Sequence, residues 1–279
     1  MRSRARETIH VLAFATRESC MMLECWLRWA SSWLVTDDQP GLGAAYDYSI
    51  HLVRHTPNVS RASSGLMRTD RWYAVLRDRL LFVRDQVHAL PINSKILFMD
   101  LDVVPLRPPA NLLRPLPPHD ITFMREPPGH GGRTGRHIVN AGLYLVVVSL
   151  ASRRFLGHWA WLTHQQRKLH DQDTANWILL AKSGQSMHHA DLRWGTWPHT
   201  TAAGRLEDVT NETIAFHAIF ATGEEKLGKI AGAIERHRQL LGAAGDGQQS
   251  ATASRLAPCT APVANGACAR WQTGASTGG

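Results

Sequence analysis

Continuously apolar runs alternate along this chain with segments whose apolar residues recur at helical spacing. Runs such as Thr8–Ala15 and Lys95–Met99 are largely apolar, which is typical of strands buried on both faces. A segment that begins at Thr69 or Asp70 instead carries an apolar stripe at helical spacing, made of Tyr73, Leu76, Leu80, Val83 and Val87. The alternation predicts a single Rossmann-type α/β domain, with a mixed, mostly parallel sheet flanked by helices.

The same patterns predict the remaining elements. We expect further strands over 32–36, 48–53, 121–125, 140–148, 192–197 and 213–220. We expect further helices over 18–31, 150–170, 171–182 and 224–241. The glycine-rich segment Pro127–Arg136 is expected to be a mobile loop. Residues 1–242 therefore form one predicted domain, whereas residues 243–279 have little to bury and are predicted to be a disordered tail.

Two carboxylates, Asp100 and Asp102, directly follow the buried strand Lys95–Met99. An aspartate at the end of such a strand is costly to bury unless it binds a cation or a hydrogen-bond donor. In mostly parallel sheets ligands bind at the carboxyl ends of the strands, where Thr16 and Arg17 follow another strand. The pair predicts a site for a divalent metal that bridges nucleotide phosphates, with an acidic surface turn as the alternative.

Composition limits the classes of partner. Hydrophobic residues make up 44% of the 279 residues and charged residues 19%, which supports a sizeable core and argues against global disorder. Lys and Arg number 31 against 23 Asp and Glu, a net charge of +8 that favours anionic partners such as nucleoside diphosphates, nucleic acid or a membrane surface. The basic residues are scattered rather than clustered, so nucleic-acid binding is not expected.

The cysteines and the apolar runs bear on the compartment. Cys20 and Cys25 fall on different faces of one predicted helix, and none of the four cysteines has zinc-site spacing, which favours a reducing compartment. No apolar run is long enough to span a membrane, and Ile9–Ala15 is better explained as a first core strand than as a signal segment. The chain therefore reads as a soluble cytoplasmic protein.

Together, four motifs resemble those of the nucleotide-diphospho-sugar transferases, which are glycosyltransferases of the GT-A fold. In chain order they are FMDLDV, VNAGLYL, HDQDTANW and FHAIFATGEEK. The resemblance extends from about Thr8 to Leu241 and is greatest to the retaining enzymes. It implies a GT-A-like fold, and a location in the Golgi lumen if an N-terminal membrane anchor is missing from the sequence.

The resemblance also implies which residues hold the metal and the donor. Asp100 and Asp102 match the family's Asp-x-Asp motif, which holds Mn²⁺ (or Mg²⁺) with the donor ribose and diphosphate. His217 matches the family's third metal ligand. Asn140 and Gly142 match an Asn-x-Gly motif that faces the donor sugar.

A second group of residues is expected around the reacting atoms. Asp171 and Gln172 match the positions near the anomeric carbon and are the predicted catalytic residues. The remaining predicted donor contacts are Thr16, Arg79, Asn176, Gly223 and Lys226. The match at Arg79 is loose, and Arg77 and Arg84 are alternatives.

Each assignment has a purely structural alternative. Asn140 would serve as well to cap a strand, and Asp171 to cap a helix. His217 could be a core histidine and Lys226 a solvated helix residue. The chain also departs from the family at Ile219, where an Asn is common, so the contacts around His217 are open.

The predicted function is metal-dependent transfer of a sugar from a nucleoside-diphosphate sugar, with UDP favoured by the resemblance, to an acceptor hydroxyl with retention. The acceptor is an unidentified glycan, protein or small molecule. A non-catalytic sugar-nucleotide-binding relative is the first alternative. A basic nucleic-acid-binding protein and a nucleotidyltransferase are the others.

Overall fold

The computed structural model describes residues 7–16, 19–36, 46–55, 70–113, 118–127, 138–166, 168–180, 189–219 and 224–245. Its centre is a six-stranded sheet in the order β2–β1–β3–β6–β5–β7. These strands are β1 (Glu7–Thr16), β2 (Tyr46–His55), β3 (Lys95–Met99), β5 (Ile121–Arg125), β6 (Val139–Val147) and β7 (Trp194–Trp197). The pairs that involve β6 are antiparallel and the others are parallel, so the expected mixed, mostly parallel sheet is confirmed.

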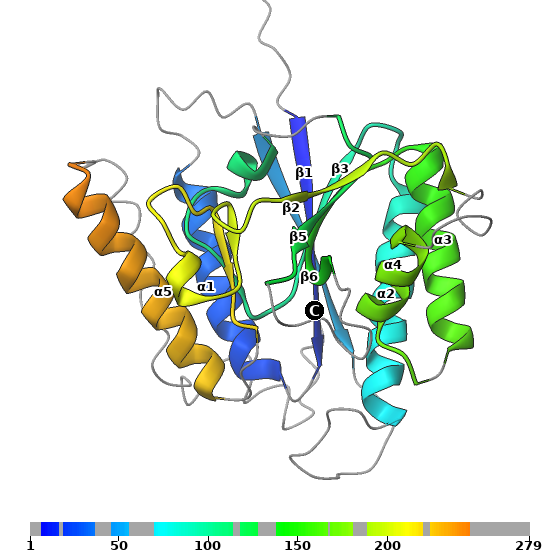
Figure 1. Cartoon of the computed structure of the whole chain (residues 1–279), viewed down its shortest axis with the longest axis horizontal. Helices are drawn as coiled ribbons and strands as arrows, with labels where there is room; N and C mark the ends of the chain where they lie inside the picture. Colours follow the sequence, from blue (N-terminus) through cyan, green and yellow to red (C-terminus); the bar gives the residue numbers. More distant parts are fainter. Residues whose placement is uncertain are drawn as a thin grey trace, which may run out of the picture.

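Helices cover both faces of this sheet. They are α1 (Cys20–Thr36), α2 (Asp70–Ala89), α3 (Leu150–Gln165), α4 (Asp171–Leu180) and α5 (Glu224–Ala243). Helices α1 and α5 lie on one face and α2, α3 and α4 on the other (Figure 1). Because successive strand residues point to opposite faces, Leu97 and Met99 join the core under α1 and α5, whereas Ile96 and Phe98 join the core under α2 and α3.

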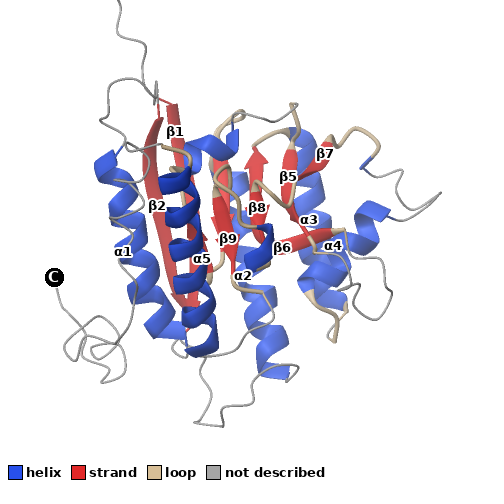
Figure 2. Ribbon diagram, turned by 60° about the vertical axis from the view of Figure 1, so that its left-hand side comes forward, coloured by secondary structure: helices blue, strands red, loops and turns tan. Residues whose placement is uncertain are grey.

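A second, three-stranded sheet packs on the side of α1 and α5 in the order β4–β9–β8 (Figure 2). Its strands are β4 (Val103–Pro105), β8 (Ala202–Ala203) and β9 (Ala215–His217), and short 3-10 helices lie at η2 (Pro109–Leu113) and η5 (Leu206–Asp208). Strand β4 follows β3 after a short turn. The two sheets therefore meet at the carboxyl end of β3, where the candidate site lies.

The expected strand over 32–36 is wrong, because α1 continues without a break to Thr36. An apolar run of this length does not distinguish a strand from the end of a helix by periodicity, and here the preceding helix extends through it. The small sheet was not predicted either, because strands of two or three residues carry too little pattern. The other expected strands and helices are present, with ends that differ by up to five residues.

The structure also bears on the expectations about the cysteines, a membrane-spanning helix, the mobile loop and the tail. Cys25 is disulfide-bonded, although the spacing of the cysteines favoured a reducing compartment. Among the described residues, no helix is both long and apolar enough to cross a membrane. The expected mobile loop from residue 128 onward and the tail beyond residue 245 lie outside the described residues.

Candidate active site

Asp100 and Asp102 lie in the turn between β3 and β4. The backbone N–H of Asp100 donates to the carbonyl of Gly142 on β6 (2.8 Å), and the N–H of Val103 donates to the carbonyl of Asp100 (3.0 Å). The N–H of Ala218, just after β9, donates to the carbonyl of Asp102 (3.0 Å). These bonds to neighbouring strands fix both carboxylates at the carboxyl end of β3, as the sequence predicted.

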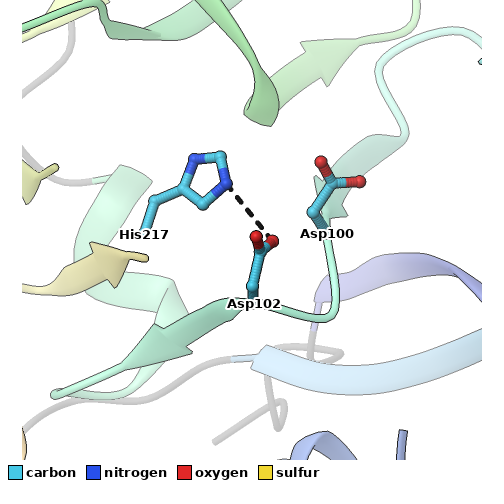
Figure 3. Close-up of side chains that lie close together, drawn as sticks. All are labelled: Asp100, Asp102 and His217. Atoms are coloured by element: carbon cyan, nitrogen blue, oxygen red, sulfur yellow. Dashed lines mark ion pairs between the residues drawn. The ribbon is translucent and has the colours of Figure 1, made fainter. Parts of the chain in front are cut away.

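Strand β9 brings His217 to these carboxylates. It runs antiparallel to β4 with His217 opposite Val103, and Nε2 of His217 lies 3.2 Å from Oδ1 of Asp102 (Figure 3). One potential ligand atom from each of Asp100, Asp102 and His217 lies within 4.8 Å of the others. Carboxylate oxygens and an imidazole nitrogen suit a divalent cation such as Mn²⁺, so these three residues fit the expected metal.

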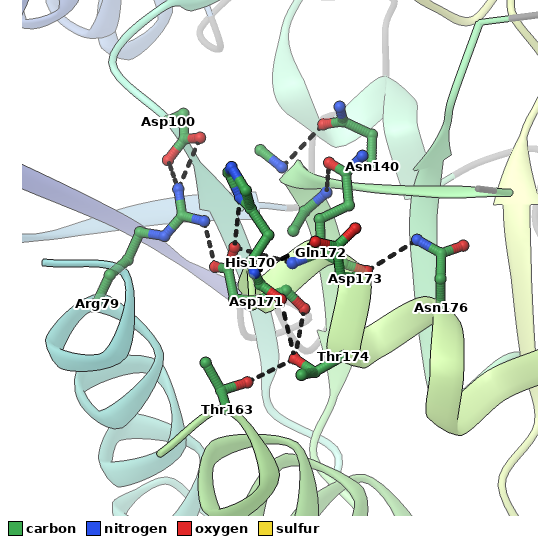
Figure 4. Close-up of polar contacts among 12 residues, drawn as sticks. Arg79, Asp100, Asn140, Thr163, His170, Asp171, Gln172, Asp173, Thr174 and Asn176 are labelled. Atoms are coloured by element: carbon green, nitrogen blue, oxygen red, sulfur yellow. Dashed lines mark hydrogen bonds and ion pairs between the residues drawn. The ribbon is translucent and has the colours of Figure 1, made fainter. Parts of the chain in front are cut away.

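Arg79 on α2 bridges two acidic residues of the site. Its guanidinium donates to both oxygens of Asp100 (2.6 and 2.8 Å) and also to Oδ2 of Asp171 (Figure 4). Both bonds to Asp100 come from Nη1, and Nη2 makes the bond to Asp171. Hydrogen bonds between a charged donor and a charged acceptor are stronger than those between neutral groups. By contrast, the alternative Arg84 pairs with its exposed neighbour Asp85. Of these two arginines, the structure brings Arg79 to the site.

Lys226, in the first turn of α5, forms an ion pair with Oδ2 of Asp102. Each carboxylate of the Asp-x-Asp pair therefore contacts a cationic side chain, Arg79 at Asp100 and Lys226 at Asp102. The Lys226 side chain remains 30% exposed, so its ammonium group can reach a ligand on the solvent side. Two cations beside two carboxylates suit a site that receives a metal together with phosphate groups.

The two carboxylates of the pair differ in their pKa. Burial raises the pKa of Asp100 and outweighs the opposing effect of Arg79, and the charge of Asp102 adds to the rise. Burial also acts to raise the pKa of Asp102, but His217 and Lys226 outweigh it and hold that pKa below its usual range. Asp102 is therefore the carboxylate that is firmly ionised before any metal binds.

Asp171 begins α4 and is only 2% exposed. Its carbonyl accepts a hydrogen bond from Nε1 of the buried Trp159 (2.7 Å), and its Oδ1 accepts one from the N–H of Gln172 (2.9 Å). Burial acts to raise its pKa, but Arg79 and then His170 outweigh this effect and lower the pKa to about 2. Asp171 is thus a fixed negative charge opposite the Asp-x-Asp pair.

The Asn-x-Gly segment of β6 contacts His217. The Asn140 side chain donates from Nδ2 to Oε2 of Glu126 (2.8 Å), and its Oδ1 lies 2.9 Å from the N–H of Gly142 and 3.1 Å from Nδ1 of His217. A Cβ atom on Gly142 would lie 2.2 Å from Cε1 of His217, so only glycine leaves room for the ring. Where the family commonly has an Asn, this chain has Ile219, whose side chain cannot hydrogen-bond to the His217 ring. Here Asn140 makes a hydrogen bond to that ring.

Glu126 is an acidic residue of the site that the sequence analysis missed. It directly follows β5 and is 7% exposed, and its Oε2 accepts hydrogen bonds from Asn140 (2.8 Å) and from Nε2 of Gln172 (3.2 Å). The Oε1 atom of Gln172 in turn accepts from the N–H of Ala141 (3.2 Å). An acidic residue directly after a buried strand was the available signal, the same one that marked Asp100.

Three predicted donor-binding residues, Thr16, Asn176 and Gly223, have no described contact with the Asp-x-Asp pair or with His217. The amide of Asn176 makes four hydrogen bonds to backbone groups, including both the N–H and the carbonyl of Val139, and so supports the start of β6. Thr16 ends β1 at the same sheet edge as the carboxylates, with its N–H (2.8 Å) and hydroxyl (3.3 Å) bonded to Ser19. Gly223 lies outside the described residues. Donor contacts by these three residues stay predictions.

A family model supplies the identification. The model described as nucleotide-diphospho-sugar transferase matches residues 66–229, more than half of the chain, and the match includes Asp100, Asp102, Asp171, His217 and Lys226. The chain belongs to the nucleotide-diphospho-sugar transferase family. The resemblance that the four motifs indicated is confirmed, and the protein is a glycosyltransferase.

Several solved glycosyltransferases are similar in structure to this chain. The bifunctional glycosyltransferase WbbM matches with a TM-score of 0.50 and 12% identity, over 89% of this transferase and 52% of that chain. A glycosyltransferase involved in glycosylation of the major capsid of PBCV-1 matches with a TM-score of 0.49 and 12% identity, over 78% and 96%. Mouse xyloside xylosyltransferase 1 matches with a TM-score of 0.44 and 15% identity, over 77% and 99%. A search of curated proteins found no match. The expected GT-A-like fold, a mixed, mostly parallel sheet with helices on both faces, is confirmed, and this chain shares its fold with about half of WbbM.

Proposed function

We propose that this transferase uses a divalent metal, Mn²⁺ or Mg²⁺, and moves a sugar from a UDP-sugar to an acceptor hydroxyl with retention of the anomeric configuration. The observation that carries the proposal is the convergence of Asp100, Asp102 and His217 from two sheets, with their ligand atoms within 4.8 Å. A metal held there would neutralise negative charge on the departing nucleoside diphosphate.

The chain's own cations would bind the same leaving group. Lys226 is paired with Asp102 and Arg79 with Asp100, and the two cations come from α5 and α2, which lie on opposite faces of the central sheet (Figure 1). Because they are already held in place, little reorganisation is needed when charge develops on the diphosphate. Lys226 is the more exposed of the two, with 30% of its side chain accessible against 11% for Arg79. Lys226 would therefore contact the diphosphate, and Arg79 would orient Asp100 and Asp171.

In the proposed reaction the bond from the anomeric carbon to the diphosphate oxygen breaks. A bond from that carbon to the acceptor oxygen forms on the same face, and the acceptor proton passes to the departing phosphate oxygen. Positive charge develops on the sugar during the exchange. Asp171, which is ionised and buried, and the amide oxygen of Gln172 would stabilise this charge.

The proposal is tested by incubating the full chain with a panel of UDP- and GDP-sugars, with and without Mn²⁺, and following donor cleavage by proton NMR. Metal-dependent release of UDP and a first-formed sugar product with the donor's anomeric configuration are expected. Binding of the donor without any cleavage would favour the non-catalytic alternative. Cleavage that is equally fast in EDTA would contradict the metal dependence.

The domain boundaries stay proposals. We propose that residues 1–242 form the catalytic domain and that residues 243–279 are a disordered tail, which is supported by the end of α5 at Ala243. Limited proteolysis should trim the chain to a stable fragment that ends near residue 243. Strong, salt-sensitive binding of DNA or RNA is not expected, since the basic residues at the site are paired with carboxylates.

A further inference from the structure

A line of buried side chains leads from Glu126 through Asn140 to His217, which itself lies beside Asp102. Oε2 of Glu126 accepts from Nδ2 of Asn140 at 2.8 Å, and Oδ1 of Asn140 lies 3.1 Å from Nδ1 of His217. All three residues are at most 7% exposed. Water is therefore largely excluded, and each group must be satisfied by its protein neighbours.

The neighbours of Asn140 fix which end of its amide faces His217. The carboxylate of Glu126 accepts hydrogen bonds, so it requires the NH₂ group of Asn140. The N–H of Gly142 donates, so it requires the amide oxygen, at 2.9 Å. Turning the amide over would place oxygen against carboxylate and NH₂ against N–H. The oxygen of Asn140 therefore faces His217.

This orientation assigns the two nitrogens of the His217 ring. Nδ1 faces an oxygen that can only accept, so Nδ1 must carry a proton and donate it to Asn140. The other nitrogen, Nε2, lies 3.2 Å from Oδ1 of Asp102, so a proton on Nε2 would be donated to that carboxylate and is the one that a bound metal would displace. In metal sites the hydrogen bond of one imidazole nitrogen sets which nitrogen binds the ion.

We propose that Asn140 and Glu126 are positioning residues that keep the proton of His217 on Nδ1, so that Nε2 is presented to the metal. The inference rests on the proposed metal-dependent function and deepens it. It gives the Asn-x-Gly segment a second task in addition to any sugar contact, namely to hold the only nitrogen ligand of the three-residue cluster in place. It also gives a role to Glu126, which no motif marked.

The first measurement is Mn²⁺ affinity of the full chain without nucleotide, from the free Mn²⁺ signal in electron paramagnetic resonance. Asn140→Ala removes the acceptor for Nδ1 and should weaken Mn²⁺ binding about 10- to 100-fold, the range for outer partners of metal ligands. Glu126→Gln keeps the shape, but its own amide can turn either end toward Asn140, so a smaller loss of up to about tenfold is expected. Glu207→Gln, at a side chain that is 70% exposed, is the matched control and should bind like wild type.

The second measurement needs no metal. The nitrogen chemical shifts of the His217 ring, assigned with the help of His217→Gln, should identify Nδ1 as protonated in the metal-free wild type at pH 7. In Asn140→Ala the bonded Nδ1 proton should no longer be protected from exchange. Thermal melting of each variant checks that it folds. If Asn140→Ala does not fold, the Mn²⁺ affinity of Glu126→Gln alone tests the proposal.

The outcomes separate this inference from the proposed function. Wild-type Mn²⁺ affinity in both variants, or an unprotonated Nδ1 in the wild type, would overturn the positioning role while leaving the metal site intact. If the wild type binds no Mn²⁺ although Nδ1 is protonated, the metal-dependent function fails, and the metal-presenting part of the inference fails with it. Weaker binding in both variants, with a protonated Nδ1 in the wild type, supports the inference.

Discussion

Gly142→Ala is the sharpest single test of the site's geometry. The added Cβ would lie 2.2 Å from Cε1 of His217 and 2.9 Å from each of its ring nitrogens. An ordinary contact begins at 3.4 Å, so the ring would have to retreat by about 1.2 Å. Strand β6 cannot yield instead without loss, because the Gly142 carbonyl accepts the 2.8 Å bond from the N–H of Asp100.

The size of the effect follows from this displacement. A shift of about 1.2 Å would move the ring out of the position in which it lies 3.1 Å from Asn140 and 3.2 Å from Asp102, and hydrogen bonds do not tolerate a displacement of that size. Overpacking of this kind typically destabilises a protein by about 1–3 kcal/mol. Because a ligand itself is displaced, Mn²⁺ affinity should fall by at least the roughly 10- to 100-fold seen for outer partners.

The assay compares Gly142→Ala with two matched glycine variants, by calorimetric titration with Mn²⁺ and by thermal melting. Cβ atoms on Gly157 in α3 and Gly228 in α5 would meet nothing within 4 Å. Alanine in those helices should be neutral or should stabilise by about 0.5–1 kcal/mol, with unchanged Mn²⁺ affinity. Wild-type Mn²⁺ affinity and Tm in Gly142→Ala would refute the account of why glycine stands there.

Three further predictions concern stability. Burial, and then Arg107, lower the pKa of His237 to about 4, so the protein should lose at most about 3 kcal/mol of stability as the pH falls from about 6.5 to 4. His237→Leu should flatten that part of a urea-denaturation profile. Arg79→Met leaves the buried Asp171 without its cation and should cost about 3 kcal/mol in the same assay. Ser149→Ala removes the cap of α3 and should cost about 0.5–2 kcal/mol, visible as a lower Tm.

Each of these predictions has an outcome that would contradict it. An equally steep acid profile in His237→Leu would mean that other groups govern stability between pH 6.5 and 4. The sign is set by the lowered pKa, since the unfolded chain takes up the proton before the folded chain does. Arg84→Met is the control for Arg79→Met, and an equal loss in the two would show that the buried contact to Asp171 is not what matters. No change on removing the cap would point to redundant partners at the start of α3.

The sequence predicted those parts of the fold that depend on long patterns. Strands β3 and β5 have the expected bounds, and the apolar stripe on α2 is buried as expected at Leu76, Leu80, Val83 and Val87. Because packing against the core requires apolar residues at regular spacing, these elements can be predicted from the sequence alone. The small second sheet could not be predicted in this way, because β4 pairs with β9, which lies more than a hundred residues later in the sequence.

The site was predictable in its members but not in its contacts. Asp100, Asp102 and His217 were expected to share a metal and do converge, because strand ends meet at one edge of the fold. The hydrogen bond that Asn140 on β6 donates to Glu126, just after β5, involves a residue outside the four motifs, so the spacing of the motifs did not predict this contact. The sequence also did not show that Gly142 leaves room for the ring of His217, because the two residues are in contact but far apart in the sequence.

Thermal melting with UDP, with and without Mn²⁺, tests the central claim most directly, on wild type and on Asp102→Asn. A specific ligand at a hundred times its Kd should stabilise the folded chain by about 2.7 kcal/mol. The account predicts that UDP raises the Tm of the wild type only when Mn²⁺ is present, and that Asp102→Asn abolishes the rise. An equal shift in both proteins, or a shift by UDP that needs no metal, would contradict a donor site built on a metal at Asp100, Asp102 and His217.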